Sequence, residues 1–395
     1  MDEPDWWPSG IAQNSVDNAL TEGILRTSFG KSSVWDVSLA LEPEWWNAFL
    51  INHSTWGEWP QKVESATLVK SAANRRNEVV VCINQTILAS LTPIHCGDDV
   101  SRIVRHKPWF LKLENEPLLL PKGGWSVDGN DRILLYPMHS YLTFGGEDSS
   151  VMEMVEQLGN LHSALAPFTT PSTERRWNDR LKAVEDQLKT NTMWRAPHCS
   201  TTFGLPRLHL SLDSVVEVDG KQMFLPLCRS LSEHLLCESD RLPSLASLMM
   251  LEHQWARKEG LSEQQRQNML ETWSRSVPSS WSSRSALSTV RGGAWVWRYH
   301  ATVLELAQAK AFGDETTVKA CEQWLREVSR LQAYLGTLRM WKSGQWVGIT
   351  GLIVSFFAWK LETLTPNQSL TVAFLSLGVG LVTNFIYRVK DPKPY

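Results

Sequence analysis

The longest uncharged apolar stretches of the 395-residue chain lie near its C-terminal end. Residues 346–359 read WVGITGLIVSFFAW, and residues 370–387 read LTVAFLSLGVGLVTNFIY. When the first stretch is extended to residues 344–364, with Lys360 turned back to the interface, both are close to the roughly 20 residues that span a bilayer core. The short polar turn between them contains Pro366. This pattern predicts a transmembrane helical hairpin over residues 344–388.

The charges that flank the hairpin predict its orientation. Basic residues gather on the outer side of both segments, and the turn carries only Lys360. These flanking residues are Arg339, Lys342, Arg388, Lys390 and Lys393. Because positive residues stay on the cytoplasmic side, we expect the soluble part and the tail over 389–395 to be cytoplasmic. The partner so implied is the lipid bilayer; a buried hairpin in a soluble core is the alternative, which the uncharged length disfavours.

Small residues recur in both apolar segments. They are Gly348, Gly351, Ser376, Gly378 and Gly380. Small residues let helix backbones approach closely in a membrane. They predict close packing of the two helices, or of two copies of the chain as a homo-oligomer.

The first 140 residues show short β-type runs separated by Gly, Asp and Pro. The runs cover residues 78–83, 86–91, 109–113, 117–120 and 132–136. A helix is expected before them, over residues 61–73, and short apolar runs between turn signals are typical of strands. We therefore predict a β-rich domain over residues 1–140.

Residues 141–340 show mainly helical periodicity. Apolar residues at helical spacing follow the N-cap candidates Asp148 and Ser149, and Ser262 with Gln265 forms a capping-box pattern. Further helices are expected from Ser172 and over 244–258, 295–311 and 314–340. A β interruption is expected over 208–212, 215–218 and 222–227, because Asp219-Gly220 suits a hairpin turn. The expected class is α+β.

Composition narrows the choice of partner. The net charge is −3 and the basic residues are scattered, so no concentrated face for nucleic acid is expected. Six dispersed cysteines indicate reduced thiols, and the adjacent pairs His95-Cys96 and His198-Cys199 do not have zinc-ligand spacing. The 20 tryptophans could form a sugar platform, but aromatic residues dominate cores and interfaces.

Three motifs resemble the aminoglycoside and choline phosphotransferase branch of the protein-kinase-like superfamily. They are Leu158-Gly-Asn-Leu-His-Ser-Ala-Leu, then Gly204-Leu-Pro-Arg-Leu-His-Leu-Ser-Leu-Asp-Ser-Val-Val with Val218-Asp-Gly-Lys, and Trp297-Arg-Tyr-His300. The resemblance covers roughly residues 78–334. It implies a two-lobed fold, with a β-rich N-terminal lobe and a helical C-terminal lobe.

The resemblance also implies a catalytic site, and the sequence departs from it. Phosphoryl transfer in this fold uses an Asp, an Asn and a second Asp with Mg²⁺, and a Lys on the ATP phosphates. Aligning the hairpin places His209 at the catalytic Asp and Ser214 at the Asn; a second register places Ser211 at the Asp. Residues 224–227 offer no carboxylate for Mg²⁺. Asp213 lies close by, and Lys70 is the nearest substitute for the phosphate anchor.

These departures predict a pseudokinase: a membrane-anchored scaffold or regulator that acts by binding another protein. Two alternatives stay open. One is an atypical active phosphotransferase that uses ATP with Mg²⁺ and takes its carboxylates from elsewhere in the chain. The other is a tryptophan-rich membrane protein that binds carbohydrate or lipid. Function has to be argued from the site, because one fold serves many functions.

Overall fold

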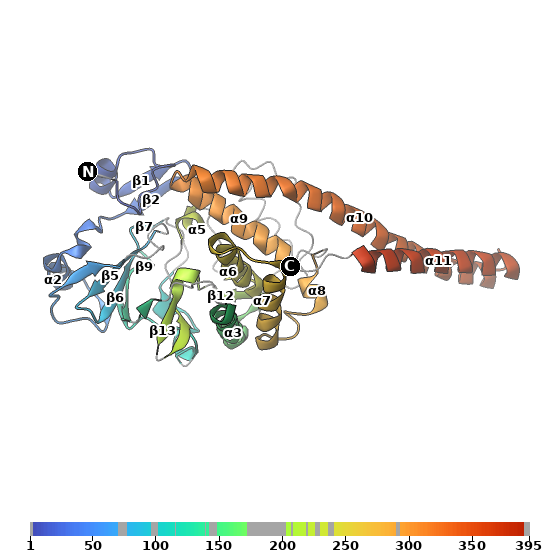
Figure 1. Cartoon of the computed structure of the whole chain (residues 1–395), viewed down its shortest axis with the longest axis horizontal. Coiled ribbons are helices and arrows are strands. Elements are labelled where there is room, and N and C mark those ends of the chain that lie inside the picture. The colour runs from blue at the N-terminus through green and yellow to red at the C-terminus, as the bar shows by residue number, and fades with distance from the viewer. Residues whose placement is uncertain are drawn as a thin grey trace.

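This computed structural model describes the chain apart from the following residues: 1–2, 70–76, 96–101, 115, 139, 142–147, 172–202, 207, 219, 226–229, 236–240, 290–292 and 391–395. The described part is a mixed α+β structure, as the sequence predicts, with strands concentrated in its first half and helices in its second. Figure 1 shows the strands at one end, the helices beside them, and two long helices that extend beyond the body.

A six-stranded antiparallel sheet dominates the N-terminal half. In spatial order its strands are β3 (Trp56–Gly57), β8 (Gly123–Val127), β9 (Asn130–Pro137), β6 (Ile87–Leu91), β5 (Val79–Ile83) and β4 (Ala66–Leu68). The central strands β5, β6 and β9 are buried along most of their length. Their Val, Ile and Leu residues favour a pleated, covered surface, and this explains why these strands were predictable.

Aromatic residues fill one side of this sheet. The elements around them are α1 (Val16–Glu22), α2 (Pro43–Asn52) and a small sheet of β1 (Ile24–Thr27), β2 (Gly30–Val34) and β7 (Ile94–His95). Trp6, Trp7 and Trp46 are each less than 5% exposed, and the Trp46 indole donates to the Ala40 carbonyl over 2.7 Å. Trp45 stacks on Phe49 of α2. These tryptophans are core residues rather than a sugar platform.

The helical half packs around one large apolar core. Its helices are α3 (Asp148–Ala164), α5 (Leu231–Leu235), α6 (Ser244–Lys258), α7 (Glu263–Ser276), α8 (Arg284–Leu287) and α9 (Gly293–Ala311). Short strands lie between them: β10 (Ser140–Tyr141) with β13 (Val215–Val218) and β14 (Lys221–Phe224), and β11 (Thr170–Pro171) with β12 (Phe203–Pro206) and β15 (Arg241–Leu242). The capping box of Ser262 and Gln265 begins α7, as its sequence pattern predicts.

Two helices form an antiparallel pair that leaves the body. The first, α10 (Glu315–Lys360), is continuous over 46 residues and packs on α9 through its N-terminal part. The second, α11 (Pro366–Lys390), returns alongside it (Figure 1). Within the described residues, α11 is the helix that is long and apolar enough to cross a membrane. The apolar part of α10 is shorter, because Ser343, Gln345 and Lys360 border it.

Several predicted elements differ in the structure. Residues 61–65 form no helix and Ala66–Leu68 is strand β4, because its backbone pairs with β5, a long-range contact that local periodicity does not reveal. Residues 110–112 form a 3₁₀ turn instead of a strand, and Leu118 makes only one isolated bridge to Phe224. Residues 208–211 are irregular before the 3₁₀ turn Leu212–Ser214. The helix expected from Ser172 lies outside the described residues.

The histidine of the first motif lies inside the helical core. His162 of α3 is 2% exposed, and its Nδ1 accepts a hydrogen bond of 3.0 Å from the Trp273 indole of α7. Burial lowers the pKa of His162 from 6.5 to about 3. The imidazole is therefore a neutral acceptor that joins two helices, not a ligand or a catalyst.

This burial predicts an acid-dependent loss of stability. Because the folded-state pKa lies below the unfolded value, the stabilisation is full above about pH 6.5 and falls toward pH 3. We expect His162→Asn, which keeps an acceptor at this position, to remove up to about 1.4 kcal/mol per pH unit of this dependence. Denaturant unfolding in detergent between pH 7 and pH 4 measures it, with the exposed His106→Asn as control. Identical pH slopes for wild type and His162→Asn would contradict the assignment.

Candidate functional site

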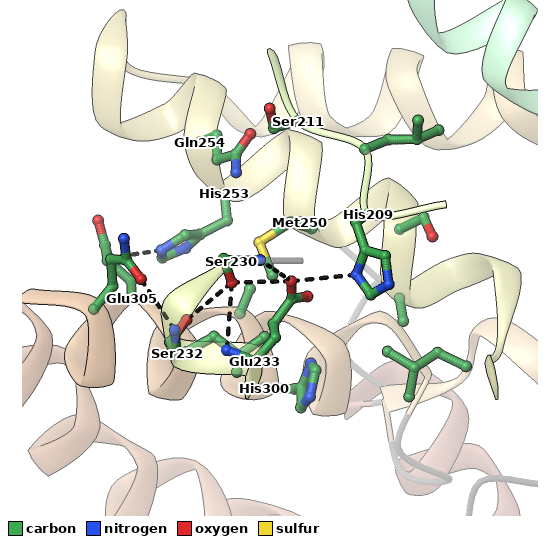
Figure 2. Close-up of a pocket in the computed structure, with 17 residues that line it drawn as sticks. His209, Ser211, Ser230, Ser232, Glu233, Met250, His253, Gln254, His300 and Glu305 are labelled. Atoms are coloured by element: carbon green, nitrogen blue, oxygen red, sulfur yellow. Dashed lines mark hydrogen bonds and ion pairs between the residues drawn. The ribbon is translucent and has the colours of Figure 1, made fainter. Parts of the chain in front are cut away.

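The segment that the phosphotransferase resemblance identifies as the catalytic loop borders a cavity of about 200 Å³ in the helical half. The cavity lies between residues 209–211, the start of α5, and the facing sides of α6 and α9 (Figure 2). Two histidine–glutamate pairs line it: His209 with Glu233, and His253 with Glu305. Figure 2 shows these pairs on opposite sides of the cavity.

His209 is held in an unusual backbone conformation. Its φ is +50°, in the left-handed region that residues other than glycine seldom adopt. Such a conformation costs of order 1–3 kcal/mol and is maintained only when surrounding contacts fix it. The His209 side chain makes one such contact, since its Nδ1 lies 3.3 Å from Glu233 Oε2.

Glu233 belongs to the short helix α5 and also caps it. Its Oε2 accepts hydrogen bonds from the Ser230 backbone N–H (3.0 Å) and the Ser230 hydroxyl (2.9 Å). The Ser232 backbone N–H donates to the Gln308 side-chain oxygen of α9 over 3.2 Å. The glutamate side chain is 7% exposed, so its oxygens are largely removed from water, and the two Ser230 donors satisfy Oε2.

The second pair lies on the facing helices. Glu305 Oε2 of α9 lies 2.7 Å from His253 Nε2 and accepts from Arg257 Nε (3.1 Å) and from the Cys321 thiol of α10 (3.1 Å). Burial raises the pKa of Glu305, but the hydrogen bond from His253 and the other donors outweigh it, so the net pKa is lowered. Burial, with the neighbouring Glu305 charge, raises the pKa of Cys321 to about 12. Glu305 is thus an ionised carboxylate, and the neighbouring Cys321 is a protonated thiol.

The sequence candidates are distributed unevenly around the cavity. His209 and Ser211 line it. Ser214 is fully buried, and its hydroxyl accepts from the Ser211 N–H (2.9 Å) and donates to the Ser211 carbonyl (2.6 Å), so it holds the turn. Asp213 is described only in its backbone, within the same turn. The resemblance places a metal-binding carboxylate within residues 224–227, of which Phe224 ends β14. Lys70 and residues 226 and 227 lie outside the described residues.

Sequence reasoning missed Glu233, His253 and Glu305. Ser230-Leu-Ser-Glu233 is an S-x-x-E capping pattern, which could have revealed α5 and the position of Glu233. His253 and Arg257 are four residues apart on α6 and therefore share a face, but nothing local indicates that Glu305 meets them. Over the described part of the chain, no group of three His, Cys, Asp or Glu side chains is arranged to hold a metal ion.

Comparison with known proteins gives structural likenesses alone. No family model matches the chain, and no curated protein matches it in sequence. A glucosamine kinase structure has 11% identity and a TM-score of 0.44, covering 80% of this chain and 91% of that one. A macrolide 2'-phosphotransferase type I has 12% identity and a TM-score of 0.42, covering 74% and 98%.

A third likeness is the GDP complex of an aminoglycoside 2'-phosphotransferase, with 11% identity, a TM-score of 0.43, and coverage of 68% of this chain and 93% of that one. All three likenesses have identities of 11–12% and TM-scores of 0.42–0.44. At such identities and TM-scores they assign no activity to this chain.

The hydrogen bonds of Glu305 predict a pH-dependent contribution to stability. We expect Glu305→Gln to lower the free energy of unfolding at pH 7 by about 2 kcal/mol, because charge-assisted hydrogen bonds are lost. Since the folded-state pKa is lowered from 4.5, this contribution is full above pH 4.5 and disappears at lower pH. Denaturant unfolding at pH 7 and pH 3.5 measures it, with the exposed Glu153→Gln as control. A cost that is the same at both pH values would contradict the ionised state.

Proposed function

We propose that this chain is a membrane-anchored protein of kinase-like organisation that acts by binding and does not transfer phosphoryl groups. Its role is then that of a scaffold or regulator that presents a protein-binding surface at the membrane. One observation carries the proposal. His209, which aligns with the catalytic aspartate, directs its imidazole Nδ1 to Glu233, 3.3 Å away.

The chemistry of that position supports inactivity. Phosphoryl transfer in kinase-like folds needs a carboxylate beside the attacking hydroxyl and oxygen ligands on Mg²⁺. His209 supplies an imidazole instead, and Glu233, whose Oε2 lies 3.3 Å from it, already accepts two hydrogen bonds from Ser230. Glu233 therefore acts as a structural acceptor for α5 rather than as a metal ligand.

The exposed surface of the helical hairpin supports membrane anchoring. Its large apolar side chains point outward, including Trp346 at 62%, Phe374 at 68% and Phe385 at 69% exposure. Contiguous apolar surface of this kind is rare on soluble proteins and typical of a membrane or protein contact. The anchor that we propose comprises the end of α10 together with α11.

The hairpin predicts firm association with membranes. We expect the full-length chain to remain in the membrane fraction after alkaline carbonate extraction. Replacing Leu375 and Leu381 of α11 together by Lys should release much of it into the soluble fraction, because a charged residue at the centre of a spanning helix costs about 3 kcal/mol. The matched control places two lysines on the body, at the exposed Leu111 and Ile51. Complete extraction of the wild-type chain by carbonate would overturn the anchor.

The aligned histidine predicts no productive binding of nucleotide. A ligand at 100 times its dissociation constant stabilises the folded state by about 2.7 kcal/mol. We expect the melting temperature of the full-length chain in detergent to be unchanged by millimolar ATP with Mg²⁺, compared with ATP and a chelator. A shift that depends on Mg²⁺ would contradict the proposal and favour an atypical phosphotransferase. Loss of that shift in His209→Ala would then place the nucleotide at this cavity.

A further inference from the structure

The register of the hairpin is fixed by close contacts between its two helices. Gly348 of α10 packs against α11 so closely that a Cβ there would lie 2.7 Å from the Gly380 backbone. Nearer the turn, the Ser355 hydroxyl donates to the Ser369 carbonyl over 2.7 Å, and the Ser369 hydroxyl donates to the Ser355 carbonyl over 3.0 Å. Residues of the two helices that lie at the same height can therefore be identified.

Four cations lie at the same height where the pair meets the body. We call Arg339, Lys342, Arg388 and Lys390 the basic collar. Lys342 Nζ lies 5.6 Å from the centre of the Tyr387 ring, and the Tyr334 hydroxyl donates to the Lys390 carbonyl, so both ends are side by side. Arg339, Arg388 and Lys390 are exposed, and Lys342 is partly so.

The sequence around the collar contains little negative charge. No Asp or Glu occurs in residues 328–361 of α10 and the start of the turn, or in residues 366–390 of α11. Asp391 follows the collar and is accompanied by Lys393. The opposite end of the hairpin has Lys360 and Glu362, one charge of each sign. The excess of positive charge therefore lies at one end of the apolar pair.

The apolar zone beyond the collar has the thickness of a bilayer. From Lys342 to Lys360 the helix rises ~27 Å at 1.5 Å per residue, close to the ~30 Å of a hydrocarbon core. Trp346, four residues past Lys342, is 62% exposed, and Trp359 at the far end is 47% exposed. Tryptophan prefers membrane interfaces. This spacing puts the collar at the level of the lipid headgroups next to the body.

From this geometry we infer that the basic collar binds the headgroups of anionic phospholipids in the leaflet that faces the body. The inference rests on the proposed membrane anchor and adds a lipid preference to it. Four cations with few counter-charges complement anionic headgroups, whereas zwitterionic headgroups offer no net charge to them. Each Lys or Arg near an anionic surface strengthens attraction about fivefold.

The test uses brominated lipids, whose acyl chains quench nearby tryptophans. The full-length chain is placed in nanodiscs that contain both phosphatidylcholine and phosphatidylserine. In one sample part of the phosphatidylserine is brominated, and in the other the same amount of phosphatidylcholine is brominated. Trp341, Trp346 and Trp359 are the tryptophans of the hairpin region. We expect brominated phosphatidylserine to quench severalfold more of this emission than brominated phosphatidylcholine, and high salt to reduce the difference.

Two matched variants distinguish the effect of the basic collar from the effect of net charge alone. Arg339→Gln with Lys342→Gln, Arg388→Gln and Lys390→Gln should abolish the difference between the two lipids. The control changes four exposed cations elsewhere, Lys31→Gln, Lys221→Gln, Arg284→Gln and Lys319→Gln, and should retain it. Equal quenching of the wild-type chain by both lipids would overturn the collar and leave the anchor intact. No quenching by either lipid would overturn the anchor itself.

Discussion

One half-buried acceptor, the carboxylate of Glu305, joins the helices on which both the cavity and the hairpin depend. Glu305 lies on α9, and its Oε2 contacts His253 and Arg257 of α6 and accepts a hydrogen bond from the Cys321 thiol of α10. Since α10 continues without a break into the apolar pair, the wall of the cavity and the proposed anchor are one continuous element. In the arrangement that we propose, the length of α10 sets the distance between the cavity and the membrane.

A second carboxylate, Glu252, is fully buried and links three helices of the same half. It lies on α6; Arg298 of α9 donates to its two oxygens over 2.8 and 3.0 Å, and Arg266 of α7 donates to the same side chain. A bidentate pair of this kind is strongly directional, and removing one partner would leave an uncompensated buried charge. Glu252 therefore fixes the positions of α6, α7 and α9, and His253, the next residue, lines the cavity.

Local sequence patterns predict an element correctly where its own residues determine its structure. They fail where contacts between distant segments determine it. Apolar periodicity predicts α3 and α6, and the capping box at Ser262 predicts α7. The motif alignment identifies His209, which lines the cavity. The sequence predicts helix where strand β4 forms, because β4 is defined by its pairing with β5, which local periodicity does not encode. Glu233 and Glu305 were missed because their histidines are 24 and 52 residues away, a relation that only the packed fold establishes.

The burial pattern along α10 indicates where the packed body ends and the proposed membrane anchor begins. Cys321, Leu325, Val328, Leu335 and Leu338 form a buried stripe that packs on the body. Beyond Met340, at 61% exposure, α10 packs against α11, and large apolar side chains face outward around the pair. In water such a surface would be costly, at about 25 cal/mol per Å² of apolar area. The change occurs at the basic collar, so the end of the packed stripe, the cations and the start of the apolar zone independently mark one boundary.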